Sequence, residues 1–134
     1  MHYGTDFDAK RGSPVWAAHQ GVDETATYMK DFGRVIVLNH GDGFSTLYAH
    51  LNKIRVKYGE TVRQGQRIGD VGSSGLSTGP HLHFEMRIDH VLRNPKKYLP
   101  YYWMPFCSLV KRSATSLRWQ RHVSNLARVH LLGR

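Results

Sequence analysis

The stretch that decides the fold is VIVLNHGDGFSTLYAH, which runs from Val35 to His50. Its first four residues are apolar and mostly β-branched, a composition that favours a strand. The turn sequence Gly-Asp-Gly follows at residues 41–43, and the chain then returns in a second run that begins at Phe44. Two strand-forming runs around a glycine-rich turn are typical of a β-hairpin.

Shorter runs of the same kind follow the hairpin, and glycine separates most of them. We expect strands at 54–56, 60–62, 67–71 and 81–88, turns at 58–59, 64–65 and 89–90, and an irregular loop from Ser73 to Pro80. No segment before Leu99 has a helical period. Many short strands at even spacing predict an all-β fold, a small antiparallel β-sandwich or barrel-like domain.

Charge divides the chain into a body and a tail. The net charge is +9, yet residues 105–134 carry six Lys and Arg and no acidic residue. Trp119, Val123 and Leu126 have helical spacing, which favours a weak basic amphipathic helix in this tail, with disorder as the alternative. We therefore expect one domain over residues 1–104, followed by the tail. Its charge attracts anionic wall polymer, a membrane surface or nucleic acid alike, so it names no partner.

Several classes of protein are excluded by bulk features. A chain of 134 residues has room for one ordinary domain, which we expect to be a monomer. It holds no apolar run long enough to span a membrane, and its first residues are no signal peptide. If the protein is exported, we expect its targeting segment upstream. Cys107 is the only cysteine, so metal ligands must come from histidines and carboxylates.

Histidine and carboxylate side chains gather at two places with the spacing of a metal site. On the predicted strand 81–88, His81 and His83 share one face, roughly 6–7 Å apart. His2 and Asp6 flank Gly4 in a segment that we expect to be extended or turning. A catalytic zinc site needs three protein ligands and one open position, and His2, Asp6 and either histidine of the pair supply three.

A third element, Tyr48-Ala49-His50-Leu51, stands at the end of the hairpin's second strand. With His-x-x-x-Asp before it and Ser-Thr-Gly-Pro-His-Leu-His-Phe-Glu after it, the pattern resembles the lysostaphin/LytM-type family of zinc metallopeptidases, which cleave peptidoglycan. The resemblance extends from residue 2 to about residue 99. Further matching segments are Gly12-Ser13-Pro14-Val15-Trp16-Ala17-Ala18, Asn39-His40-Gly41-Asp42-Gly43-Phe44, the Gly-x-x-Val-x-x-Gly-Gln run that begins at Gly59, and Asn94-Pro95.

This resemblance implies a small antiparallel β domain with a groove over one Zn²⁺ per chain. It implies that His2, Asp6 and His83 are the zinc ligands and that His50 and His81 are catalytic histidines beside the metal. It further implies a metalloendopeptidase whose substrate is peptidoglycan, cut in its stem peptides or cross-bridges, and an extracytoplasmic site of action in the cell envelope, the periplasm or the medium.

The chemistry of such a site suggests a role for each histidine. We expect His81 to accept the proton of the attacking water and to pass it to the leaving amine. His50, protonated or as an N–H donor, is expected to stabilise the oxyanion. Glu85 lies on the face of His81 and His83, where it either orients one of them or is a surface strand residue.

Two departures from the family pattern and three rival functions remain. Only Met1 precedes His2, so we interpret the domain as N-terminally shortened, and residues 105–134 match nothing in the family.

A catalytically inactive relative would have lost zinc ligands, which this chain keeps. A phosphocarrier or lipoyl domain has no use for His-x-x-x-Asp. Specific nucleic-acid binding ranks last, because the body lacks interleaved aromatic and basic residues.

Overall fold

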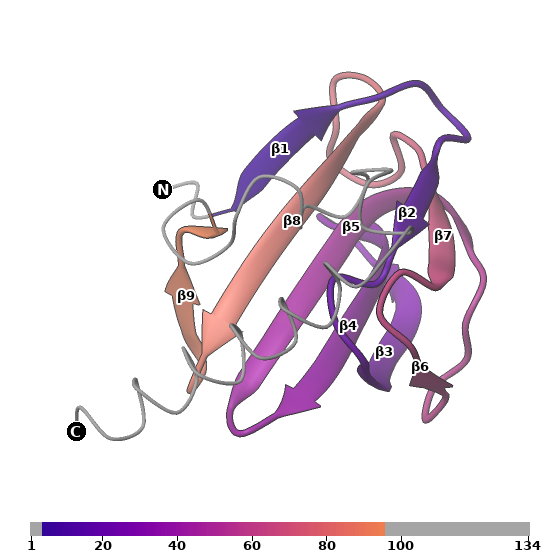
Figure 1. The fold of residues 1–134 in the computed structure, drawn as a ribbon. Coiled ribbons are helices and arrows are strands. Elements are labelled where there is room, and N and C mark those ends of the chain that lie inside the picture. The colour runs from indigo at the N-terminus through magenta and orange to yellow at the C-terminus, as the bar shows by residue number, and fades with distance from the viewer. Residues whose placement is uncertain (1–3, 96–134) are drawn as a thin grey trace.

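The computed structural model describes residues 4–95 and shows nine β-strands (Figure 1). Their bounds are β1 (Thr5–Asp8), β2 (Pro14–Trp16), β3 (Gly21–Met29), β4 (Gly33–Gly41), β5 (Phe44–Ile54), β6 (Thr61–Val62), β7 (Arg67–Val71), β8 (His81–Ile88) and β9 (Val91–Arg93). The predicted domain boundary and the basic tail lie outside the described residues. No helix in the described part is long and apolar enough to cross a membrane.

The strands form one open antiparallel sheet around β5, which confirms the predicted all-β class. One edge of β5 pairs with β4, and β3 and β6 follow beyond it. The other edge is shared: residues 44–49 pair with β8, and residues 51–54 pair with β7. β8 in turn pairs with β1 and β9, so the order along the main path is β1-β8-β5-β4-β3-β6.

Most of the strands that were predicted between glycine-rich turns are present in the structure. The hairpin of β4 and β5 is confirmed, and β7 and β8 have the predicted bounds. The strand expected at 54–56 was wrong, because Ile54 ends β5 and the next two residues leave the sheet. β1, β2, β3 and β9 were not predicted as strands. β3 is half-exposed and contains polar residues along its length, so its sequence has no apolar run that would indicate a strand.

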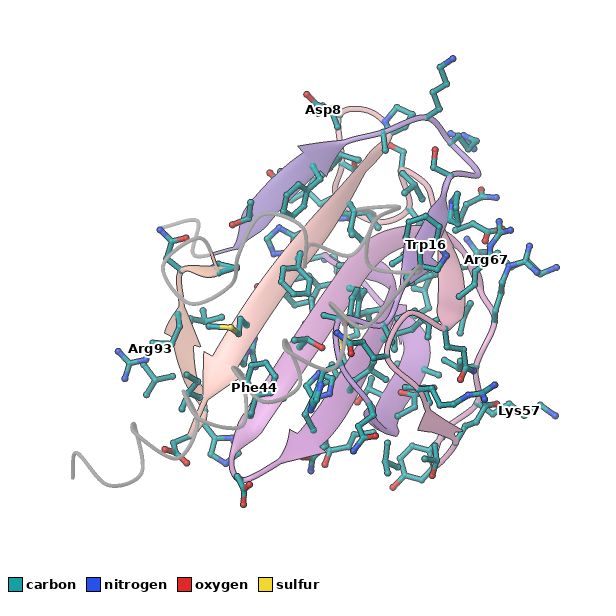
Figure 2. The ribbon with its side chains drawn as sticks, viewed as in Figure 1. Asp8, Trp16, Phe44, Lys57, Arg67 and Arg93 are labelled. Atoms are coloured by element: carbon teal, nitrogen blue, oxygen red, sulfur yellow. The ribbon has the colours of Figure 1, made fainter. Side chains whose placement is uncertain are left out.

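The main core lies on one face of the sheet. On β8 it takes Leu82, Phe84 and every second residue after them, while β2 and β7 cover that face (Figure 1). Figure 2 shows side chains filling this space, with Trp16 of β2 beside Arg67 of β7, its partner in the register. Each large apolar side chain buried in this way contributes about 1.5–3 kcal/mol. Because side chains alternate along a strand, the other face of β8 presents residues 81, 83, 85 and 87.

A chain of buried polar groups crosses the core face. The Ala18 N–H donates to the Tyr48 hydroxyl at 2.9 Å, which lies 2.9 Å from the Thr46 hydroxyl. The hydroxyl of Thr46 lies 2.7 Å from His40 Nε2, and His40 Nδ1 lies 2.8 Å from the Gln20 carbonyl. Burial lowers the pKa of His40 to about 3, so its ring is neutral and has one N–H. That N–H must serve the carbonyl, so Thr46 donates to His40 and Tyr48 donates to Thr46.

Two buried carboxylates have opposite surroundings. Asp70 accepts hydrogen bonds from Arg55, at 2.8 and 3.0 Å, and from Arg67. Bonds to Arg55 lower the pKa of Asp70, and although burial opposes them, Arg67 adds to the lowering. Asp23 is 1% exposed, and one of its oxygens accepts from the Thr25 N–H at 2.9 Å. The other oxygen has no hydrogen-bond partner among the described residues.

Candidate active site

The pairing of β1 with β8 builds the centre of the candidate site. Its register places Asp6 opposite His83 and Asp8 opposite His81, so these side chains share the face away from the main core. His83 Nδ1 lies 2.8 Å from Asp6 Oδ1, and His81 Nε2 lies 3.7 Å from the same oxygen. The structure thus brings together Asp6, His81 and His83. His2 lies outside the described residues.

Gly4 leaves room for the imidazole of His83. A Cβ at this position would lie 2.6 Å from His83 Nε2, closer than such atoms approach in proteins. Any side chain here would displace the ring, so the backbone of residue 4 forms one wall of the site. From the sequence, this glycine was evidence only against a helix.

Glu85 holds the second nitrogen of His83. Its Oε1 lies 3.0 Å from His83 Nε2, and its Oε2 accepts from Arg87 at 2.7 Å. Burial alone would raise the pKa of Glu85, but the bonds from His83 and Arg87 outweigh it and lower that pKa. Of the two roles expected for Glu85, orientation of a histidine matches this contact.

His83 therefore lies between two carboxylates. Burial lowers its pKa, but the hydrogen bonds to Glu85 and Asp6 outweigh burial and raise it overall. The ring is then an imidazolium, or else a cation takes the place of the Nδ1 proton while Nε2–H stays on Glu85. Carboxylate oxygen and imidazole nitrogen are both good zinc donors, so Asp6 and His83 fit the predicted metal. Within residues 4–95 no group of three His, Cys, Asp or Glu side chains is close enough to hold a metal ion.

His81 has its tautomer fixed by the loop before it. Its Nδ1 lies 2.8 Å from the Gly79 carbonyl and 3.2 Å from the Ser77 hydroxyl. A carbonyl oxygen only accepts, so Nδ1 carries a proton, and Nε2 is the nitrogen with the lone pair in the neutral ring. This basic nitrogen is the one that faces Asp6.

His50 reaches the site from the point where β5 changes partner. Its ring centre lies 4.8 Å from that of His81 and 5.9 Å from that of His83, and its Nδ1 lies 2.7 Å from the Ser74 carbonyl. Burial lowers the pKa of His50, the Ser74 bond opposes this, and the neighbouring histidines add to the lowering. The ring is therefore a neutral Nδ1–H tautomer near pH 7. This geometry favours a proton acceptor at Nε2, whereas an N–H donor or a protonated ring was expected from the sequence.

An apolar floor extends beside the histidines on the same face. The ring of Phe32 stacks on His83 with centres 5.9 Å apart, and it packs with Val37 against a small buried cluster. The members of that cluster are Val35, Leu47 and Ala49. Of these apolar side chains only Phe32 and Val37 are partly exposed, so these two border the site.

All of these side chains lie within residues 1–95, the part of the chain that matches Peptidase family M23. The chain belongs to this family. The resemblance to the lysostaphin/LytM-type peptidases is thereby confirmed.

Relatives in family M23 include enzymes named for their action on peptidoglycan. Peptidoglycan DD-endopeptidase ShyC of Vibrio cholerae is 43% identical over 95 residues, which are 71% of this chain and 22% of that protein. A metalloprotease of Haemophilus influenzae is 44% identical over 95 residues, 70% of this chain and 20% of that protein. The chain spans about a fifth of the length of these curated relatives.

Solved M23 structures have the same fold. The catalytic domain of lysostaphin from Staphylococcus simulans, an antimicrobial peptidase, is 39% identical, with a TM-score of 0.71 over 74% of this chain and 79% of that one. The catalytic domain of the prophage-encoded M23 protein EnpA from Enterococcus faecalis is 35% identical, with a TM-score of 0.69 over 75% and 80% of the two chains.

Proposed function

We propose that this M23 domain is a zinc-dependent endopeptidase that hydrolyses peptide bonds of bacterial peptidoglycan. The observation that carries the proposal is the pair Asp6 and His83, whose donor atoms lie 2.8 Å apart beside two histidines whose Nδ1 atoms are held by backbone carbonyls. The names of the relatives support the substrate, and a zinc-containing peptidase of Vibrio cholerae among the similar structures supports the metal.

One Zn²⁺ would be held by His2, Asp6 and His83. When bound, the ion polarises the scissile carbonyl and lowers the pKa of its water toward about 7. Glu85 keeps the His83 ring in place by accepting its Nε2–H. Partners that orient a ligand in this way are typically worth about 10–100-fold in metal affinity.

His81 and His50 would move the protons. Each ring donates Nδ1–H to a carbonyl of the same loop, which leaves Nε2 as the basic nitrogen of the neutral ring. His81 accepts the proton of the attacking water and delivers it to the leaving amine. His50, when it takes up a proton at Nε2 from solvent, would donate that Nε2–H to the oxyanion of the tetrahedral intermediate and return the proton to solvent after the intermediate breaks down.

The bond that is cut is proposed to be a cross-link of the stem peptides, since several relatives are named DD-endopeptidases, with glycine cross-bridges as the second candidate. We propose that residues 1–104 form the peptidase domain and act as a monomer outside the cytoplasm. The +6 charge of residues 105–134 would add affinity for anionic wall polymer or a membrane surface, without a specific nucleic-acid partner.

Digestion of purified peptidoglycan tests the function. The full chain, loaded with zinc, is incubated with wall material that has direct stem-peptide cross-links and with material that has glycine cross-bridges, and the products are identified by mass. We expect new amino and carboxyl ends at the stem-peptide cross-link. Asp6→Asn and a chelator are the matched controls, and product formation that is equal in all three samples, or absent from both substrates, would refute the proposal.

A further inference from the structure

The ladder between β4 and β5 is interrupted at the candidate catalytic histidine. Ile36 pairs with Tyr48, but the next pair is Arg34 with Leu51, so β5 advances three residues while β4 advances two. His50 lies inside this bulge and has φ of 60°, a left-handed conformation that only a few per cent of non-glycine residues adopt. Its N–H leaves the ladder and donates to the Phe32 carbonyl at 2.7 Å.

The hydroxyl of Ser74 fills the gap that the bulge opens. It accepts from the Arg34 N–H at 3.0 Å and donates to the Leu51 carbonyl at 2.6 Å. These two backbone groups belong to residues that are partners in the register, yet the hydroxyl is inserted between them. A hydroxyl can take this place because it donates and accepts at once, and alanine cannot.

The main chain of the same residue orients the ring. The Ser74 carbonyl lies 2.7 Å from His50 Nδ1 and selects the tautomer with Nε2 unprotonated. One residue thus supports both the backbone bulge and the imidazole of His50.

Close packing against the β3–β4 turn fixes the place of Ser74. Gly33, with φ of 66°, contacts the backbone of Ser74 so closely that a Cβ would overlap it, and Gly75 contacts the backbone of residues 31 and 33 in the same manner. The Leu76 N–H also donates to the Asp31 carbonyl at 2.9 Å. The loop that contains Ser74 therefore packs directly on the β3–β4 turn, and the contacts of Ser74 and of the residues after it with this turn fix the position of the hydroxyl.

We propose that Ser74 is a positioning residue for catalysis. Its hydroxyl maintains the bulge in β5, and the bulge directs Nε2 of His50 toward the reacting atoms. The proposal rests on the proposed function of His50, and it concerns kcat, because the hydrogen bonds of this hydroxyl go to the backbone of Arg34 and Leu51 and not to Asp6 or His83.

The test compares Ser74→Ala with Thr78→Ala, which removes an exposed hydroxyl from the same loop, and with Ser74→Thr, which keeps the hydroxyl. The zinc-loaded full chain is examined by ¹⁵N NMR of the imidazoles at pH 8, by metal analysis and by steady-state kinetics on cross-linked stem peptide. In Ser74→Ala we expect the bulge to relax and to move the His50 ring away from the Ser74 carbonyl, which the variant keeps. The ring should then lose its single Nδ1–H tautomer and kcat should fall about 10–100-fold, with KM and zinc content within twofold. Thr78→Ala and Ser74→Thr should keep the tautomer and stay within threefold of the parent kcat.

Three results would overturn the inference: an Nε2–H tautomer in the parent protein, an unchanged His50 tautomer in Ser74→Ala, or a changed tautomer with unchanged kcat. The first of these needs no variant, so the inference stays testable if Ser74→Ala fails to fold. If the parent protein hydrolyses no peptide, yet its tautomer is Nδ1–H and changes in Ser74→Ala, the proposed function fails while the placement of the ring by Ser74 stands.

Discussion

Replacing Asp23 by asparagine should make the protein more stable at neutral pH. Burial raises the pKa of this carboxyl from 3.8 to about 6, the bond from Thr25 opposes the rise, and the charge of Glu60 adds to it. The folded protein therefore binds a proton that the unfolded chain has already lost between about pH 4 and pH 6. In this window the free energy of unfolding falls as pH rises. A rise of this size in the pKa of Asp23 corresponds to a change of about 3 kcal/mol in the free energy of unfolding.

The size of this effect is measured as the change in the free energy of unfolding between two pH values. The asparagine side chain has no charge and keeps an oxygen for the Thr25 N–H, so Asp23→Asn should lose this pH dependence. Urea unfolding of both proteins is measured from pH 4 to pH 7.5, at equal metal content. Relative to its value at pH 4, the free energy of unfolding of the variant at pH 7.5 should exceed that of the parent by up to about 3 kcal/mol.

Asp70→Asn is the matched control with the opposite sign. The arginines lower the pKa of Asp70, so its stabilising contribution is present above about pH 4 and is lost as pH falls through the lowered pKa. This variant should be less stable than the parent at pH 7.5, and the deficit should shrink toward pH 3. If the curves of the parent and Asp23→Asn run parallel from pH 4 to pH 7.5, the assignment of the pH dependence to Asp23 is refuted.

Three further changes test the core and the site. Thr46→Val breaks the buried chain of hydrogen bonds at its centre and leaves the Tyr48 hydroxyl without its acceptor. The free energy of unfolding, measured by heat or urea, should fall by about 2–3 kcal/mol, and a fall below about 0.5 kcal/mol would contradict the donation from Tyr48 to Thr46. Glu85→Gln should weaken zinc binding about 10–100-fold in a chelator competition, because the carboxylate that holds His83 becomes a weaker acceptor; unchanged affinity would show that Glu85 does not orient the ligand. His81→Ala should retain its zinc but lose about a hundred- to ten-thousand-fold in kcat, and loss of the metal would instead make His81 a ligand.

Local patterns predicted the parts of the fold that local residues specify. The hairpin, β7 and β8 are dense in β-branched and apolar residues between turns, and the period of two placed His81 and His83 on one face correctly. β3 was missed because only its pairing with β4 and β6 makes a strand of a half-polar segment. The same limit applies to β1, whose four residues become a strand only on β8.

The candidate site, like the fold, could be predicted from the sequence only in part. The candidate side chains were named from their types and spacing together with the family resemblance, and the structure places Asp6, His50, His81 and His83 near one another. Of the groups that orient them, only Glu85 was expected from the sequence. Gly79 acts through a main-chain carbonyl, which has no signature in the sequence, and the hydroxyl of Ser74 acts where the ladder of two other strands is broken.

The pairing of β1 with β8 has a consequence for the order of folding. Asp6 and His83 are 77 positions apart, and bringing such distant residues together costs about 4 kcal/mol of loop-closure entropy before any contact is gained. Contacts of this range form slowly compared with the local hairpin of β4 and β5. A chain emerging from the ribosome must be complete beyond residue 83 before these two side chains can meet, so a shorter nascent chain cannot assemble the candidate metal site.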